Sequence, residues 1–205
     1  MTNKKYNNYF LSIIFVLVCS IHAQSQVFDY KSLDTIPELT LEQALKKDPL
    51  TVYRLDLKRQ KLVDLPESIT QFKNLQTLDV SKNKLKHFPS LIVKFKFLQN
   101  LNISDNKIDA VPAEIGDLIY LKEFSANQTE ISTLPAEIGK LKELKYLDVW
   151  GSNLASFPEE ISQLQETLKE IDMRVIMMSD AEHKKIKELL PTTKIHFSKS
   201  CNCGF

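Results

Sequence analysis

Residues 98–118 read LQNLNISDNKIDAVPAEIGDL, and this stretch carries the pattern that decides the fold. In its first part, the apolar residues Leu101 and Ile103 alternate with polar ones, which is the period-2 signature of a half-buried β-strand. In its second part, Ile115 and Leu118 are spaced by three, which favours a short helical or 3₁₀ segment. The stretch therefore predicts one strand followed by one helical turn on the opposite side.

The same pattern occurs five times, with a constant period of 23 residues and no slip in register. Its units begin at Val52, Leu75, Leu98, Leu121 and Leu144. Each unit has a proline between its two parts, which fixes φ and lacks an N–H, so the strand ladder ends there. These prolines are Pro66, Pro89, Pro112, Pro135 and Pro158. Because one unit cannot bury its own apolar side, the five predict a stacked solenoid with a continuous core.

A polar residue recurs at the exit of each predicted strand. The five are Gln60, Asn83, Asn106, Thr129 and Ser152. Stacked amide and hydroxyl side chains there can bond the backbone groups of the bend, which would otherwise be buried without partners. We therefore expect a polar ladder along one edge of the solenoid.

The segments 75–85 and 98–108 match the pattern L-x-x-L-x-L-x-x-N-x-L most closely. On these motifs the chain resembles leucine-rich repeat proteins over residues 52–167. The added L-P-x-x-I-x-x-L tail is similar to the 23-residue subtype of Ras-suppressor-like scaffolds and secreted bacterial repeat proteins. The resemblance implies an α/β fold, a curved leucine-rich-repeat solenoid with a concave parallel sheet and short helical or 3₁₀ convex segments. Thr129 and Ser152 depart from the Asn position, which weakens the polar ladder locally.

Two segments outside the repeats are predicted to cap the stack. Residues 24–51 form the N-terminal cap, in which Thr40 and Gln43 have the spacing of a capping box that opens a short helix to Lys47. Residues 168–205 form the C-terminal cap. Its parts are a sixth strand over 168–173, a helix over 180–190, a last strand over 194–197 and a tail with Cys201 and Cys203.

Residues 1–23 have the layout of a cleaved secretory signal peptide, with a basic start, an apolar run and Ala23 before polar residues. The apolar run is shorter than the roughly 20 residues that span a bilayer. An uncleaved anchor and a lipoprotein acylated at Cys19 remain alternatives, although the bulky Val18 does not suit a lipoprotein site. We expect a secreted, periplasmic or cell-envelope location, with no transmembrane span in the mature chain.

The chain of 205 residues is 43% hydrophobic and 26% charged, which is enough to form one domain with a hydrophobic core. Its formal net charge is +1, so basic side chains barely outnumber acidic ones. Near-neutrality gives no reason to expect nucleic acid as a partner. The sequence contains no P-loop, nucleophile elbow or zinc-protease motif, so we expect no enzyme, no cofactor and no metal. His87, His183 and His196 are expected to be plain surface or cap residues. Cys201 and Cys203 leave inter-chain pairing, closure on each other and free thiols open.

Polar residues between the buried strand positions should form three rows on the concave face. The first row is Arg54, Thr77, Asn100, Glu123, Tyr146 and Glu170. The second row is Asp56, Asp79, Asn102, Ser125, Asp148 and Asp172. The third row is Lys58, Ser81, Ser104, Asn127, Trp150 and Arg174. Six strands spaced by about 4.8 Å would give a face that fits a helix, a loop or a small domain edge.

Exposed Trp and Tyr beside Arg are the residue types that carry most interface energy, so Tyr146, Trp150 and Arg174 form a predicted hot spot. The full set predicted to bind a partner is Tyr146, Trp150, Arg174, Asp148, Asp172, Asn127 and Glu123. The alternative for the aromatic residues is an isolated surface side chain lying on its neighbours, which is ordinary.

Adjacent aspartates in the second row repel one another and need compensation. Lys58, Arg59 and Lys82 could supply it at one end, and Arg174 at the other. A bound Ca²⁺ is the alternative, although two or three ligands on a rigid sheet fall short of the six to eight that Ca²⁺ takes.

These patterns predict an exported, monomeric protein that binds a protein partner through its concave face without catalysis. Two other functions stay open. One is a structural or envelope-associated component without a discrete soluble partner, and the other is carbohydrate binding through Trp150 and Tyr146 with the Asp/Asn row.

Overall fold

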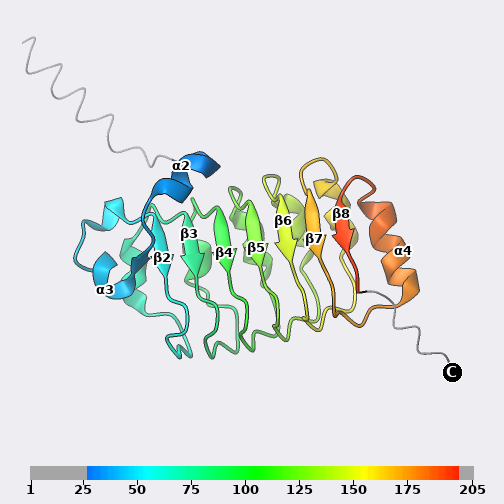
Figure 1. The fold of residues 1–205 in the computed structure, drawn as a ribbon, viewed down its shortest axis with the longest axis horizontal. Coiled ribbons are helices and arrows are strands. Elements are labelled where there is room, and N and C mark those ends of the chain that lie inside the picture. The colour runs from blue at the N-terminus through cyan, green and yellow to red at the C-terminus, as the bar shows by residue number, and fades with distance from the viewer. Residues whose placement is uncertain (1–26, 199–205) are drawn as a thin grey trace, which may run out of the picture.

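The computed structural model describes residues 27–198, which form one eight-stranded parallel sheet. Each strand pairs with the next one along the chain, so the order in the sheet is the order in the sequence. The strands are β1 (Leu39–Thr40), β2 (Arg54–Asp56), β3 (Thr77–Asp79), β4 (Asn100–Asn102), β5 (Glu123–Ser125), β6 (Tyr146–Asp148), β7 (Glu170–Asp172) and β8 (Lys194–His196). Figure 1 shows this row of strands along the length of the molecule, and the solenoid predicted from the 23-residue period is confirmed. The predicted leader 1–23 and the two tail cysteines lie outside the described residues.

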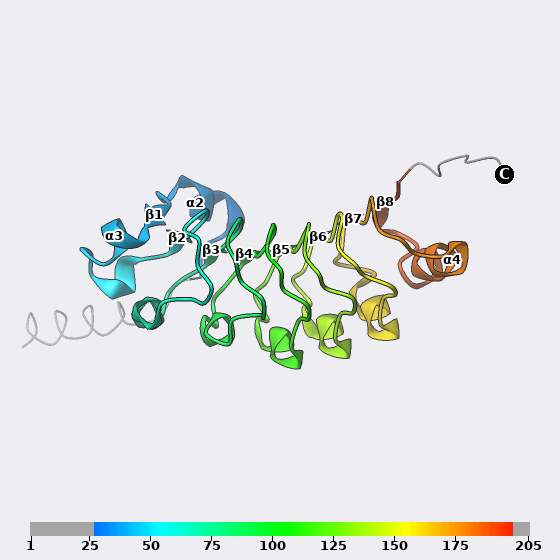
Figure 2. The same ribbon diagram turned by 90° about the horizontal axis from the view of Figure 1, so that it is seen from below.

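Short 3₁₀ helices line the side opposite the sheet. They are η1 (Pro49–Thr51), η2 (Glu67–Gln71), η3 (Ile92–Lys94), η4 (Ala113–Asp117), η5 (Ala136–Lys140) and η6 (Glu159–Leu164). A proline directly precedes four of them, where its fixed φ turns the chain out of the strand ladder. Figure 2 shows the strands on the upper side of the arc and the helical turns on the lower side, as the apolar spacing of three predicts.

The core lies between the sheet and the 3₁₀ helices, and it is one continuous cluster along the solenoid. The inward-facing residue at the centre of each repeat strand is buried; Leu55, Leu78 and Phe124 have no exposed surface. Burying one such side chain stabilises the fold by about 1.5–3 kcal/mol. Because every repeat adds the same layer, the alternation of apolar residues read from the sequence fixes the inner side of the sheet.

The predicted polar ladder is present in the middle of the solenoid. Asn83 and Asn106 each donate from Nδ2 to three backbone carbonyls, and their Oδ1 atoms accept from backbone N–H groups. Thr129 keeps one such bond, to the carbonyl of Ala126. The prediction is wrong for two positions. The Ser152 hydroxyl is buried and has no partner in the described part of the chain. Gln60 is exposed, and only its backbone N–H bonds the ladder, at Oδ1 of Asn83.

At the N-terminal end, α3 (Leu41–Ala44) begins at Thr40 with the predicted capping box. The Thr40 hydroxyl accepts from the N–H of Gln43, and the Gln43 side chain accepts from the N–H of Thr40. The helix is shorter than the one predicted to Lys47, because Leu45 already forms its C-cap.

A second N-terminal helix, α2 (Tyr30–Thr35), was not predicted from the sequence. It begins at Asp29, whose carboxylate accepts from the N–H groups of Lys31 and Ser32. Just before it, the Phe28 ring meets Tyr53 edge-on, with ring centroids 4.8 Å apart. Figure 1 shows α2 above β2 and β3, while α3 lies at the N-terminal end of the row of strands.

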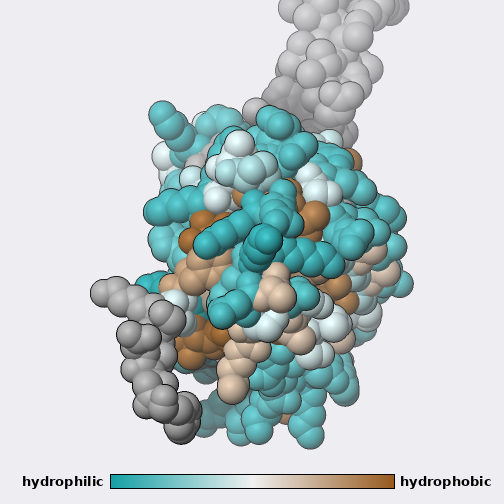
Figure 3. All heavy atoms as spheres, turned by 90° about the vertical axis from the view of Figure 1, so that its right-hand side faces the viewer, coloured by the Kyte–Doolittle hydropathy of each residue, from teal (hydrophilic) through white to brown (hydrophobic). Residues whose placement is uncertain are grey.

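The C-terminal end is closed by α4 (Asp180–Leu189), which begins at Ser179 as a side-chain N-cap and confirms the predicted helix. Its inner residue Ile186 is buried, while Lys184 and Lys187 are exposed. Figure 3 shows this end of the molecule as mostly hydrophilic, with hydrophobic side chains only in scattered patches. No helix within residues 27–198 combines the length and the apolar character that crossing a bilayer requires.

Candidate functional site on the concave sheet

The outward-facing side of the sheet is the candidate site, and its first two predicted rows are confirmed by the strand register. Arg54 pairs with Thr77, which pairs with Asn100, and the same row continues through Glu123, Tyr146 and Glu170. The second row runs in the same way from Asp56 to Asp172. Strand β8 extends both rows with Lys194 and His196, which adds two basic groups at the C-terminal end.

The second row has a structural role that sequence reasoning missed. In five strands its Asp or Asn side chain accepts a hydrogen bond from the backbone N–H two residues later. The pairs are Asp56 with Lys58, Asp79 with Ser81, Asn102 with Ser104, Asp148 with Trp150 and Asp172 with Arg174. This is the Asx-turn that Asp and Asn favour at chain bends. The recurrence of Asp or Asn at one repeat position is the signal from which this role could have been predicted.

After this bond the chain passes through a left-handed residue in each repeat. These residues are Arg59, Lys82, Asp105, Gln128, Gly151 and Val175, with φ between 50° and 62°. Because the left-handed turn ends the alternation of inward and outward side chains, the prediction of a third exposed row is wrong. Ser81 and Ser104 are only 2% and 3% exposed, so the third row is not a continuous exposed one.

The aspartates of the C-terminal half are compensated within the chain. The guanidinium of Arg174 donates from Nε and Nη2 to the Asp172 carboxylate, at 3.0 Å and 2.6 Å. This contact is the main reason why the pKa of Asp172 lies below its usual value. Asp148, the neighbour of Asp172 in the register, accepts from Nδ2 of Asn127. The predicted compensation by Arg174 is therefore confirmed.

At the other end the prediction for Lys82 is wrong. Its ammonium group lies 3.9 Å from Asp105 in the exit turns, instead of beside the Asp row. The left-handed conformation of both residues carries their side chains past the sheet edge. Asp79 instead accepts a bond from Nδ2 of Asn102, at 3.2 Å.

Glu170 joins the last two strands through its carboxylate. His196 bonds it from Nε2 and Lys194 lies 3.2 Å away, so the pKa of Glu170 is lowered, mainly by the His196 bond. These contacts fix the position of β8 on the sheet. Of the three histidines within residues 27–198, His196 thus has a specific partner on the concave side, whereas the ring of His183 packs on Phe197 in the cap.

A shallow hollow of about 310 Å³ lies over strands β5 to β7 and gathers four of the predicted binding residues. Its lining residues are Glu123, Ser125, Tyr146, Leu147, Asp148, Glu170 and Asp172. The Tyr146 side chain is 45% exposed at the start of β6 and forms its apolar wall. The hollow therefore presents one aromatic ring among carboxylates whose geometry is held by neighbouring side chains.

Trp150 and Arg174 do not line this hollow. Trp150 lies in the exit turn beyond β6, half-buried, about 13 Å along the chain from Tyr146 at the usual rise per strand residue. Arg174 lies beyond β7 and is bound to Asp172. The three residues of the predicted hot spot are therefore spread out: Tyr146 lines the hollow at the start of β6, and Trp150 and Arg174 lie in the exit turns beyond β6 and β7.

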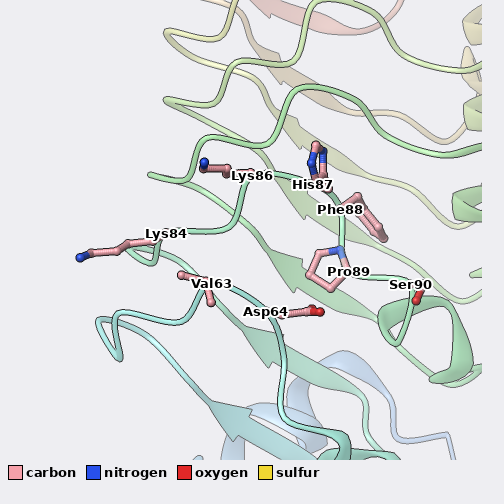
Figure 4. Close-up of a pocket in the computed structure, with 8 residues that line it drawn as sticks. All are labelled: Val63, Asp64, Lys84, Lys86, His87, Phe88, Pro89 and Ser90. Carbon is pink, nitrogen blue, oxygen red and sulfur yellow. The ribbon is translucent and has the colours of Figure 1, made fainter.

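Another hollow, of about 460 Å³, lies away from the sheet between the chain segments that follow β2 and β3. Figure 4 shows it, with Val63, Phe88 and Pro89 as apolar lining and the amino groups of Lys84 and Lys86 pointing outward. His87 lies 3.4 Å from Asp109 of the next repeat and is largely exposed. Within residues 27–198, no group of three His, Cys, Asp or Glu side chains has the arrangement of a metal site.

The repeats and the sheet have counterparts among known proteins. A family model described as a leucine-rich repeat region matches residues 49–129. A solved leucine-rich repeat protein of Leptospira interrogans is 34% identical over 67% of this chain, with a TM-score of 0.64. The chain is a leucine-rich repeat protein.

A second similar structure is the plant peptide hormone receptor RGFR1 in complex with RGF2, with 27% identity over 70% of this chain and a TM-score of 0.58. This leucine-rich repeat chain spans 35% of the Leptospira protein's length and 24% of the receptor's. No curated protein sequence matches it.

Proposed function

We propose that this leucine-rich repeat chain is an exported, non-catalytic protein that binds a protein partner through its concave sheet. The observation that carries the proposal is the hollow over β5 to β7, where Tyr146 stands among Glu123, Asp148 and Asp172. Recognition there is an equilibrium between preformed surfaces, because the carboxylates of Asp148 and Asp172 are already held by hydrogen bonds within the chain. The similar structure, a plant peptide hormone receptor in complex with RGF2, supports the use of such a fold for binding a polypeptide ligand.

The binding residues have different tasks in this proposal. Tyr146 supplies an exposed aromatic surface, the residue type most enriched at binding hot spots. Asp148 and Asp172 are held by Asn127 and Arg174, so they meet a partner without a further loss of side-chain freedom. Trp150 extends the surface at the turn edge.

The segment 1–23 supports export. The apolar run before Ala23 has the length and flanks of a cleaved leader. Mass spectrometry of the protein purified from its native source tests this directly: a mature chain starting at Gln24 agrees with cleavage, and a chain retaining residues 1–23 contradicts it.

Partner capture tests the binding function. Wild type and the Tyr146→Ala/Trp150→Ala variant are used as baits, and we expect the partner recovered with wild type to be lost with the variant. Phe97→Ala/Tyr120→Ala is the matched control, because it removes an aromatic pair, with ring centroids 6.1 Å apart, from the segments before β4 and β5 and outside the hollow beside Tyr146. Circular dichroism checks that all three proteins are folded.

Recovery of the same partner by both double variants contradicts binding through Tyr146 and Trp150. Retention of the protein in an envelope fraction without any captured partner favours the structural alternative instead. Loss of recovery with the control variant alone places the binding surface at Phe97 and Tyr120.

A further inference from the structure

A second hollow on the concave face lies nearer the N-terminal end, between Glu38 and strands β3 to β5. It has a volume of about 180 Å³, smaller than the hollow beside Tyr146. Its lining residues are Glu38, Thr77, Leu78, Asp79, Asn100, Leu101, Asn102, Glu123 and Ser125. The polar part of this lining consists of carboxylates, amides and hydroxyls, and it contains no Lys, Arg or His.

Two acceptor atoms in this lining are buried and have no hydrogen-bond partner within residues 27–198: Oγ1 of Thr77 and Oδ1 of Asn100. Thr77 is 9% exposed, so its hydroxyl faces this hollow from a buried position. Asn100 donates from Nδ2 to Glu123 on the next strand, so its carboxamide is held in place while its Oδ1 accepts no hydrogen bond. Buried polar atoms without a partner are rare and call for an explanation.

The charges around this hollow are less compensated than those at the C-terminal end. Burial raises the pKa of Glu38, and the negative charges of Asp56 and Asp79 raise it further, against the opposing effect of Arg54 and Lys58. The guanidinium of Arg54 itself donates to the carbonyl of Leu33 and to Asp34, beyond the hollow. By contrast, Asp172 and Glu170 have a guanidinium, an imidazole and an ammonium group as direct partners.

We propose that the hollow bounded by Glu38, Thr77, Asp79 and Asn100 binds the ammonium group of a lysine side chain on a protein partner. An ammonium group has three N–H donors, which match the unpaired oxygens of Thr77 and Asn100 and a carboxylate of Asp79 or Glu38. The compact ammonium suits this small hollow better than the planar guanidinium of arginine. The proposal rests on the proposed function, since it assigns one chemical group of the partner to one part of the concave face.

A metal ion fits this lining less well than an ammonium group. Ca²⁺ takes six to eight oxygens at close range, and the described residues contain no group of three carboxylate, His or Cys side chains arranged for a metal. An ammonium group has three N–H donors and so needs only three acceptors.

A tripeptide of lysine, acetylated at its N-terminus and amidated at its C-terminus, serves as the probe. It is titrated into the ¹⁵N-labelled protein at low ionic strength, and amide chemical shifts are followed by NMR. We expect saturable shifts in residues of β3 to β5 at millimolar peptide. The same peptide with Nε-acetylated lysines should produce none, because it lacks the charge and two of the three donors.

Three variants locate the binding. Glu38→Gln/Asp79→Asn should weaken binding by about tenfold, the effect of removing two nearby charges in partly desolvated surroundings. Asn at position 79 keeps the turn, because Asn102 makes the equivalent bond in the next repeat. Thr77→Val should weaken binding several-fold without loss of stability, since the hydroxyl it removes has no partner. Glu114→Gln/Glu143→Gln removes the same charge from exposed positions off the sheet and should leave binding unchanged.

Absence of saturable shifts overturns the proposal, as do shifts centred on β6 to β8 or an equal loss of binding in the Glu114/Glu143 control. These results are independent of the partner-capture experiment. Lysine peptide binding in this hollow together with unaltered capture by the Tyr146/Trp150 variant would contradict the hot spot and leave the lysine site standing. Partner capture by wild type that is lost in the Tyr146/Trp150 variant, together with no peptide binding, would support the hot spot and overturn the lysine site.

Discussion

The buried carboxamide of Asn106 bonds four backbone groups of two neighbouring repeats. Asn106→Ala leaves these groups unpaired in the core, so we expect the free energy of unfolding to fall by about 3 kcal/mol, as measured by urea denaturation. Asn106→Thr copies the residue at the equivalent position 129, which retains one such bond, and should lose less. An unchanged free energy of unfolding in Asn106→Ala would show that the ladder bonds do not stabilise the fold, and equal losses in the two variants would show that the bond kept by Thr adds nothing.

The ion pair of Asp172 and Arg174 makes stability depend on pH. Arg174 holds the pKa of the Asp172 carboxyl below its usual value, so the charged form is favoured in the folded state. Such a group stabilises the fold above its unfolded pKa, near 3.9, and this contribution is lost as the pH falls through the folded value. Wild type should therefore melt at a higher temperature than Asp172→Asn at neutral pH, and the difference should shrink below about pH 4.

Fluorescence of Trp150, the only Trp in the chain, provides the readout for these melts, because its backbone N–H bonds Asp148 beside the ion pair. Glu114→Gln, at an exposed position on the outer side, is the control and should follow the wild-type curve. A difference between wild type and Asp172→Asn that stays constant from neutral to acidic pH contradicts the linkage.

Adjacent 3₁₀ helices approach so closely that one glycine between them has no room for a side chain. A Cβ added at Gly139 of η5 would lie 2.4 Å from the carbonyl oxygen of Glu160 in η6. Gly139→Ala should therefore lower the free energy of unfolding by about 1–3 kcal/mol, the usual cost of overpacking, in chemical denaturation. Ala136→Ser, exposed at the start of the same helix, is the control. Equal stability of the two variants would mean that the helices separate freely.

The repeating elements could be predicted because their causes are local. Strand alternation, the proline after each strand and the Ser179 cap of α4 all lie within a few residues of the structure that they specify. The exit turns could not be predicted, because their left-handed residues are held by the next repeat. The N–H of Arg59 donates to the carbonyl of Ser81, and that of Lys82 to Ser104. Val175 adopts this conformation as well, against its own β-branched preference.

The candidate site likewise has features that local sequence predicts and features that depend on contacts between repeats. The rows of the concave face follow from the 23-residue period, and the partnership of Arg174 with the Asp row follows from charge alone. The burial of Ser81 and the unpaired hydroxyl of Thr77 depend on how stacked turns and strands fit together, which a sequence period does not contain. The six residues of α2 were missed because so short a helix has no readable periodicity.

The whole solenoid is quasi-one-dimensional, since each repeat packs on its neighbours along the chain. One buried polar network departs from this nearest-neighbour packing, because it joins the N-terminal segment at Phe28 to three successive repeats. Nε2 of Gln99 donates to the carbonyl of Phe28 and to the side chain of Gln76, whose oxygen also accepts from the N–H of Phe28. Oε1 of Gln99 accepts from the ammonium group of Lys122, at 2.6 Å.

Because Gln99 has no exposed surface, its replacement should free the segment that it holds. In Gln99→Ala we expect faster hydrogen exchange in peptides covering residues 27–36, measured by mass spectrometry under native conditions. Exchange in β6 to β8 should stay at the wild-type rate, since coupling in a repeat stack is carried by nearest neighbours and opening is local. Gln163→Ala is the control, because this exposed glutamine meets Lys142 at the outer side of the stack. Faster exchange throughout the chain would show instead that the network supports the whole solenoid. Unchanged exchange in residues 27–36 would show that apolar contacts alone, such as Phe28 on Tyr53, hold this segment.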